Sequence, residues 1–443
     1  MSTTRRRVRL ASAAVTVVTL LVAALAACSS GSGSSAKNIS LRMTVWSNDK
    51  SQNALFNSIA ASYRQSHPEI SSITFDYIPI DNYTTALTTQ IAGSNPPDLA
   101  WILERDAPDF VSSGALTDLT PTLKGTSGYG YDDLAASATK LWEQNGKLFA
   151  YPFSTSPFGM FFNKDLLAKA GVSQTPEQLL AAHQWTWPNA IKIAAQVAAK
   201  TAKQGLVIRD WNYKTWIQLA SVWRAWGAQA WSADEAWGAQ AWSADGKTCQ
   251  FDSPQMQQAM SFLHSAIFTD KALPGPGETA DFFAGESALT VTQISRASLL
   301  AKHPFNWGIV PLPSGPAGSS QVIGQAGIGV MTKGQHKQQA ADFLAYFTNS
   351  ANSAKLAQYF PPARKSQLTT TTLAKANPLF TAQQLQSVVI DGITTGSVLP
   401  SHQNSAKLST LVQNALDPLW TPNANVDSVL KGVCQAIDPV LKQ

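Results

Sequence analysis

The side chains that could do chemistry gather where predicted strands end. Parallel strands of an α/β sheet end at one common edge, and ligands bind just beyond it. Aromatic rings pack on the apolar faces of a solute such as a sugar, while acid, amide, hydroxyl and guanidinium groups pair with its hydroxyls. These residue types indicate reversible binding of a neutral polar solute. The candidate ligand contacts are Trp46, Asn48, Asp49, Trp101, Glu104, Arg105, Ser156, Phe158, Trp211, Asn212, Tyr213, Gln293 and Gln325.

Several of these residues have a second interpretation. A tryptophan at the beginning or end of a strand packs in a core as often as it lines a cleft, which applies to Trp46 and Trp101. The charges of Asp49, Glu104 and Arg105 could instead be solvated surface groups. Only 14% of all residues are charged, against about 25% in typical soluble domains. The low charge suits a neutral ligand.

Recognisable catalytic motifs are missing from the sequence. The triplet Gly246-Lys247-Thr248 ends like a phosphate-binding loop, but Ala241 stands where that loop needs a glycine. A glycosidase needs two carboxylates that flank the scissile bond, and no acid here lies in a recognisable catalytic sequence. No cysteine or histidine has metal-ligand spacing, so we expect no metal and no cofactor. A secreted carbohydrate-active enzyme remains the alternative.

Strands and helices alternate along the chain. Strands over 41–47, 72–80 and 98–103 are separated by helices over 50–67 and 83–92. This order implies βαβ units and mainly parallel sheets. A length of 443 residues suits two domains of roughly 150–200 residues each. Later expected elements include strands over 158–162 and 206–208, helices over 165–170, 215–226 and 337–348, a helix that follows residues 185–188 and ends near 202, and a set of helices over 405–441.

The N-terminus predicts export. Basic residues at 5–9 precede an apolar stretch at 11–24 and the small-residue site Leu25-Ala26-Ala27-Cys28, which resembles a bacterial lipoprotein signal. We expect residues 1–27 to be removed, Cys28 to carry lipid and residues 28–37 to form a flexible tether. An ordinary cleaved signal or an uncleaved anchor helix are the alternatives. Four arginines and no acids lie in this segment, so its removal lowers the formal charge from +5 to +1. A nearly neutral mature chain gives no electrostatic reason to expect nucleic-acid binding.

Two cysteines remain after Cys28. In an oxidising compartment a disulfide between Cys249 and Cys434 is plausible, and two separate buried thiols are the alternative. Residues 225–234 are repeated as 236–245. We interpret the copy as a lengthened surface loop that arose by duplication, with a lid or an adhesion surface as the functional alternatives.

A series of short motifs resembles family 1 extracellular solute-binding proteins, the maltose-binding-like proteins of ABC importers. The resemblance begins with residues 150–171, AYPFSTSPFGMFFNKDLLAKAG, and continues in GSNPPDLAWI, DFFAGESALTVT and WGIVPLPSGPAG. It implies a two-lobe, periplasmic-binding-protein-like α/β fold of type II, with mainly parallel sheets and two or three crossovers between the lobes. By this resemblance, residues 38–153 and 324–350 form the N-terminal lobe, and residues 154–323 and 351–443 form the C-terminal lobe.

The same resemblance implies the function. Such a protein captures a carbohydrate between hinged lobes and delivers it to a membrane permease with a cytosolic ATPase. We expect a monomer held to the outer face of the cell membrane by its lipid. Relatives often have a carboxylate at the first crossover, where this chain has Ser156. The departure leaves the solute open, and a glycerol phosphate derivative is an alternative ligand.

Overall fold

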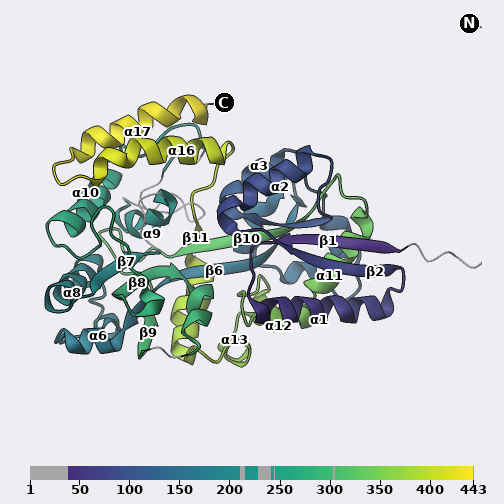
Figure 1. Cartoon of the computed structure of the whole chain (residues 1–443), viewed down its shortest axis with the longest axis horizontal. Helices are drawn as coiled ribbons and strands as arrows, with labels where there is room; N and C mark the ends of the chain where they lie inside the picture. Colours follow the sequence, from purple (N-terminus) through teal and green to yellow (C-terminus); the bar gives the residue numbers. More distant parts are fainter. Residues whose placement is uncertain (1–37, 210–214, 228–240, 244, 303–304, 443) are drawn as a thin grey trace, which may run out of the picture.

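Two strands pass through the centre of the molecule and join its two halves (Figure 1). They are β6 (Ala150–Asn163) and β10 (Val322–Val330), which pair antiparallel over most of their length. We call the half that contains β1, β2 and β3 the N-terminal lobe, and the half that contains β7, β8 and β9 the C-terminal lobe. The computed structural model describes residues 38–209, 215–227, 241–243, 245–302 and 305–442.

In the N-terminal lobe the sheet order is β2-β1-β3-β10-β6. β1 is parallel to both β2 and β3, whereas β10 is antiparallel to β3. Helices cover both faces of this sheet (Figure 1). The elements are β1 (Ile39–Val45), α1 (Lys50–Ser66), β2 (Ile70–Tyr77), α2 (Tyr83–Ala92), β3 (Leu99–Leu103), α3 (Ala107–Ser112), α4 (Thr120–Gly125), α5 (Ala136–Thr139), β4 (Glu143–Gln144), β5 (Lys147–Leu148), α11 (Lys337–Phe347) and α12 (Ser350–Leu356).

In the C-terminal lobe β6 pairs with β8, and β8 is parallel to β7. β9 also pairs with β6, and β11 pairs with the start of β10. This arrangement confirms the predicted α/β class, with parallel pairs in each lobe and the crossover strands antiparallel to them. The elements are α6 (Lys164–Lys169), α7 (Pro176–Ala181), α8 (Trp187–Lys200), β7 (Gln204–Ile208), α9 (Ala220–Trp223), α10 (Pro254–Phe268), β8 (Ser287–Gln293), β9 (Trp307–Val310), α13 (Thr370–Ala376), α14 (Ala382–Gln384), α15 (Asp391–Thr395), β11 (Ser397–Val398), α16 (Ser405–Leu416) and α17 (Val426–Leu441).

A β-bulge marks the crossover in β6. Ala326 pairs with Ser154 and Gly327 with Pro152, so Phe153 has no partner of its own in β10. A bulge bends its strand and redirects the side chain. Here the Phe153 ring packs on Phe360, with the ring centres 5.1 Å apart. The third crossover thereby contacts the first.

Residues beyond 350 still pack in the N-terminal lobe. Leu356, Phe360 and Ala363 pack in the hydrophobic core of the N-terminal lobe, although they follow the predicted boundary at residue 350. Leu368 is the first residue after them to pack against a core of the C-terminal lobe. We therefore propose a boundary near residue 367, because hydrophobic packing assigns α12 to the N-terminal lobe.

Polar contacts hold the end of this segment. The Arg364 guanidinium donates to the carbonyl oxygens of Gly130 and Thr348 at 3.1 and 3.0 Å. Next to it, Ser366 Oγ donates to Asp133 Oδ2 at 2.6 Å. These contacts fix the chain on the N-terminal lobe up to the point where it crosses.

A disulfide joins Cys249 to Cys434 of α17. Asp438 of the same helix accepts a hydrogen bond from the Cys249 backbone N–H at 2.9 Å. Both contacts tie the C-terminal helix to the body of its lobe. None of the helices in the described ranges has the length and apolarity that a membrane crossing requires. The same ranges contain no group of three or more His, Cys, Asp or Glu side chains placed to hold a metal.

Candidate ligand-binding site

The positive charge of Arg209, in the C-terminal lobe, acts on Glu104 of the N-terminal lobe, and Arg209 is hydrogen-bonded to Gln293. Glu104 follows β3 of the N-terminal lobe, Arg209 follows β7, and Gln293 ends β8. The Arg209 guanidinium donates to Gln293 Oε1 at 3.3 Å. Arg209 also has a φ of +31°, a conformation that non-glycine residues rarely adopt. The three side chains bring a carboxyl, a guanidinium and an amide to the edge where parallel strands end.

Burial raises the pKa of the Glu104 carboxyl above its ordinary value. The backbone N–H of Glu104 and the positive charges of Arg105 and Arg209 oppose this effect, and the negative charge of Asp106 adds to it. Arg105 is half-exposed, and its Nε lies 3.8 Å from Asp106 Oδ2. Glu104 is therefore partly desolvated and faces a cation from the opposite lobe.

Trp46 and Trp101 have different environments. The Trp46 ring is partly buried and packs edge-on against Trp101 and Tyr83, at 4.8 and 5.1 Å between ring centres. Trp101 is only 1% exposed and also packs on Phe153 at 4.5 Å. All five residues of β3 are buried, so both faces of this strand are covered. Trp101 is a core residue here, and Trp46 is the outer ring of the same cluster.

Asp49 caps the helix that follows the first strand. Its Oδ1 accepts from the backbone N–H of Gln52 at 2.8 Å, and both Asn48 and Asp49 are exposed. Tyr359 of the third crossover lies close by. Burial raises the pKa of the Tyr359 hydroxyl, a hydrogen bond with Ser51 lowers it, and the charge of Asp49 raises it further. Tyr359 is a candidate contact that sequence reasoning missed.

The predicted crossover contacts are buried. Phe158 is 0% exposed and lies in the core of the C-terminal lobe. Ser156 accepts a hydrogen bond from the Ser295 backbone N–H at 3.2 Å, and the Gln325 amide donates to the Ser137 carbonyl at 3.2 Å. In this structure Phe158 packs in a hydrophobic core. Ser156 and Gln325 are buried and form hydrogen bonds with neighbouring elements of the fold. In a strand buried on both faces, the sequence pattern does not distinguish a residue that packs in the core from one that contacts a ligand.

Trp211, Asn212 and Tyr213 lie outside the described residues, as does most of the 225–245 duplication. Its described ends belong to the C-terminal lobe. Trp226 packs on Phe262 with ring centres 4.5 Å apart, and Trp242 packs on His402 at 5.3 Å.

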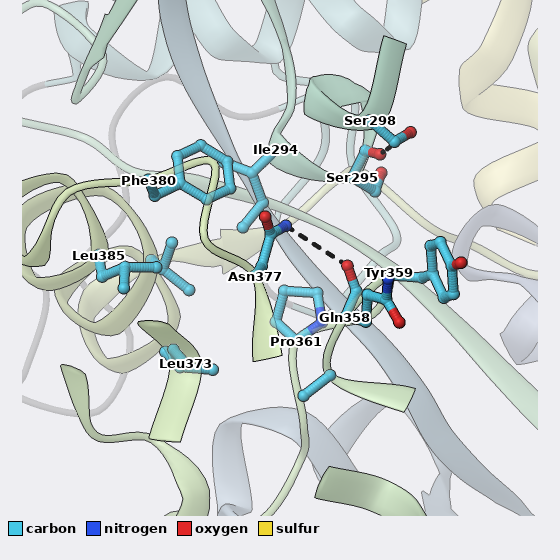
Figure 2. Close-up of a pocket in the computed structure, with 12 residues that line it drawn as sticks. Ile294, Ser295, Ser298, Gln358, Tyr359, Pro361, Leu373, Asn377, Phe380 and Leu385 are labelled. Atoms are coloured by element: carbon cyan, nitrogen blue, oxygen red, sulfur yellow. Dashed lines mark hydrogen bonds between the residues drawn. The ribbon is translucent and has the colours of Figure 1, made fainter. Parts of the chain in front are cut away.

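A small pocket of about 30 Å³ opens beside the third crossover (Figure 2). Residues of the N-terminal lobe side, Gln358, Tyr359 and Pro361, face residues of the C-terminal lobe across it. The Asn377 amide bridges the two sides by donating to the Gln358 carbonyl at 3.4 Å. Two of its lining residues, Ile294 and Ser295, directly follow Gln293 in the sequence. The opposite wall is formed by Ile294, Ser295, Ser298, Leu373, Asn377, Phe380, Leu385 and Val389.

Two curated bacterial proteins are similar to this chain over most of its length. A binding protein of Brucella abortus (strain 2308) is 23% identical over 428 residues, which cover 93% of this chain and 95% of that protein. The sn-glycerol-3-phosphate-binding periplasmic protein UgpB of Salmonella paratyphi A is 24% identical over 392 residues, 82% of this chain and 84% of that protein.

A solved structure shares the fold. The ABC substrate-binding protein Lmo0181 of Listeria monocytogenes, in complex with cycloalternan, superimposes with a TM-score of 0.78 at 19% identity. The match covers 91% of this chain and 99% of that chain. Residues 48–354 match the family described as bacterial extracellular solute-binding protein. The chain therefore belongs to the bacterial extracellular solute-binding protein family, as its sequence motifs predicted.

Proposed function

We propose that this protein is the substrate-binding lipoprotein of an ABC importer and that it captures a carbohydrate between its lobes. The observation that carries the proposal is that Glu104, from one lobe, lies within the electrostatic influence of Arg209, which is hydrogen-bonded to Gln293 in the other. A solute bound there contacts both lobes and so favours the closed arrangement in proportion to its differential affinity.

The chemistry of this group favours a neutral polyhydroxy ligand. A carboxyl accepts hydrogen bonds, a guanidinium donates them and an amide does both, which matches hydroxyls of either orientation. Trp46 offers the partly exposed edge of an aromatic cluster for the apolar face of a sugar ring. The cycloalternan complex of the Listeria relative supports a carbohydrate.

A phosphorylated solute is the second candidate. The UgpB relative binds sn-glycerol 3-phosphate by its name, and Arg209 could pair with a phosphate. The negative charge of Glu104 beside Arg209 opposes an anion at the same place. We therefore rank the neutral carbohydrate first.

The remaining expectations complete the proposal. Asn48, Asp49 and Arg105 form the exposed rim of the site, and Trp211, Asn212 and Tyr213 contribute from the loop after β7. The protein acts as a monomer, anchored to the outer face of the membrane through lipid on Cys28 after removal of residues 1–27. A permease and its cytosolic ATPase, both separate chains, receive the solute. The protein itself breaks no bond.

A thermal-shift screen of the full chain tests this function. The panel contains monosaccharides, malto-oligosaccharides, cycloalternan and sn-glycerol 3-phosphate. A ligand at 100 times its Kd stabilises the folded state by about 2.7 kcal/mol, which is readily measured. We expect a carbohydrate to raise Tm without being consumed. A rise with sn-glycerol 3-phosphate alone supports the second candidate, and turnover of a glycoside supports the enzyme. No rise with any member contradicts the carbohydrate proposal.

A further inference from the structure

Helix α16 of the C-terminal lobe has its N-terminal cap in the N-terminal lobe. Its own N-cap residue, Asn404, has a φ of +61° and makes no side-chain capping hydrogen bond. Instead the carboxylate of Asp109, in α3, accepts from the backbone N–H groups of Asn404 and Ser405 at 2.8 and 3.1 Å. A carboxylate at this position satisfies unpaired N–H groups and complements the positive end of the helix dipole.

A second carboxylate joins the contact. Ser405 Oγ donates to Asp106 Oδ1 at 3.0 Å and lies 3.3 Å from Asp109 Oδ2. Asp106 is only 4% exposed, and Thr84 Oγ1 of α2 donates to its other oxygen at 2.6 Å. The acidic partners of α16 are thus held in place by α2 and α3. We call Asp106, Asp109, Asn404 and Ser405 the interlobe cap.

The two sides of the interlobe cap belong to different packed bodies. Leu408 and Val412 of α16 lie in the core of the C-terminal lobe, whereas Phe110 and Val111 of α3 lie in the core of the N-terminal lobe. The chain itself passes between the two lobes in β6, in β10 and at the third crossover. A rotation of one lobe against the other about these crossovers separates Asp109 from α16 and leaves the first N–H groups of the helix without this partner.

We propose that the interlobe cap is a latch that stabilises the closed arrangement of the lobes. This inference rests on the proposed opening and closing of the lobes around a solute. Asp106 ends the three-residue turn Glu104–Asp106, so the latch and the candidate contact Glu104 share one rigid segment. A solute that fixes Glu104 also fixes the acidic side of the latch, and closure and binding favour each other.

Interlobe distances measured by pulsed electron paramagnetic resonance test the latch. Spin labels are placed on exposed positions of α2 and α16 through Thr88→Cys and Asn414→Cys. The full chain carries Cys28→Ser, so that only the two introduced thiols react. No solute is added, so failure of every sugar to bind would leave this result unaffected.

Asp109→Ala is the main variant, and Asp132→Ala, an exposed acid of the same lobe, is the matched control. Loss of a typical helix cap changes an equilibrium about fivefold. We expect Asp109→Ala to raise the ratio of long to short distances about fivefold, and Asp132→Ala to leave it as in the unmodified chain. A distance distribution in Asp109→Ala equal to that of the control overturns the latch.

Ser405→Ala is a second, milder variant. It removes the hydroxyl contacts with Asp106 and Asp109 and keeps the backbone N–H groups that Asp109 accepts from. We expect a smaller shift toward long distances. If Asp109→Ala does not fold, Ser405→Ala decides alone: a shift supports the latch, and an unchanged distribution overturns it.

Discussion

Thr155 of β6 and Gln325 of β10 are register partners at the centre of the molecule, where the first two crossovers run side by side. Both are buried, at 0% and 2% exposure. Among the described residues, Thr155 Oγ1 and Gln325 Oε1 have no hydrogen-bond partner. The strands that connect the lobes therefore pass through a polar and incompletely paired region, which costs stability at the place where the lobes join.

Thr155→Val tests this cost. Valine has nearly the same shape and removes a hydroxyl without a protein partner, so we expect the free energy of unfolding to stay constant or rise by up to about 2 kcal/mol. The matched control is Thr348→Val. Thr348 Oγ1 is buried but donates to the Leu344 carbonyl at 2.8 Å and lies 2.9 Å from the Tyr129 hydroxyl. Its replacement should lower stability by about 1 kcal/mol in urea unfolding. Equal losses in both variants would contradict this interpretation.

Arg364→Ala should strongly destabilise the protein. The guanidinium is 1% exposed, donates to two backbone carbonyls and lies over the Tyr129 ring at 4.6 Å. Its removal leaves the Gly130 and Thr348 carbonyls unpaired and Asp133 without its cation. We expect a loss of roughly 3–5 kcal/mol in chemical unfolding. The neighbouring exposed Lys365, changed to alanine, should lose less than about 0.5 kcal/mol. A loss of that small size in Arg364→Ala would show that this anchor is unimportant.

Glu104→Gln should change how stability depends on pH. The pKa of Glu104 is raised in the folded protein and returns toward its ordinary 4.5 on unfolding. Between these two values the folded chain binds more protons than the unfolded chain, so the free energy of unfolding falls as pH rises. Glutamine does not ionise, so the free energy of unfolding of Glu104→Gln should not fall with pH for this reason. We expect Tm of Glu104→Gln to exceed that of the unmodified protein at pH 7.5, and the difference to shrink toward pH 4. A difference that is constant across this range would argue against the raised pKa.

The regular elements could be predicted from the sequence because their signals are local. The expected helix over 83–92 coincides with α2, and the helix expected over 50–67 is α1, capped by Asp49. The helix expected over 215–226 is instead three short turns, Trp216–Leu219, α9 and Arg224–Trp226. In the crossover stretch the sequence predicts only a short strand over 158–162. The structure instead has the single strand β6 there, because β10 and β8 continue its hydrogen bonding in turn.

The candidate site was less predictable because it depends on which way a side chain points. Trp101 and Phe158 were selected, like Glu104 and Gln293, because they lie near the end of a strand. Each of the two aromatic residues is nevertheless buried in a core. The sequence analysis selected Trp211, Asn212 and Tyr213 because they follow a predicted strand. Arg209 is the first residue after that strand, β7, and was not selected. Tyr359 comes to the site only through the third crossover, a contact between distant parts of the chain that no local pattern records.

The central claim is that one solute is held by both lobes. Isothermal titration with the carbohydrate that raises Tm measures this most directly, in the unmodified chain, in Glu104→Ala of the N-terminal lobe and in Gln293→Ala of the C-terminal lobe. Hydrogen bonds to charged groups contribute about 1.5–3 kcal/mol, so we predict that Glu104→Ala weakens Kd about 10- to 100-fold and that Gln293→Ala weakens it about fivefold. Lys203→Ala, an exposed control before β7, should leave Kd unchanged. An unchanged Kd in either Glu104→Ala or Gln293→Ala would contradict capture between the two lobes.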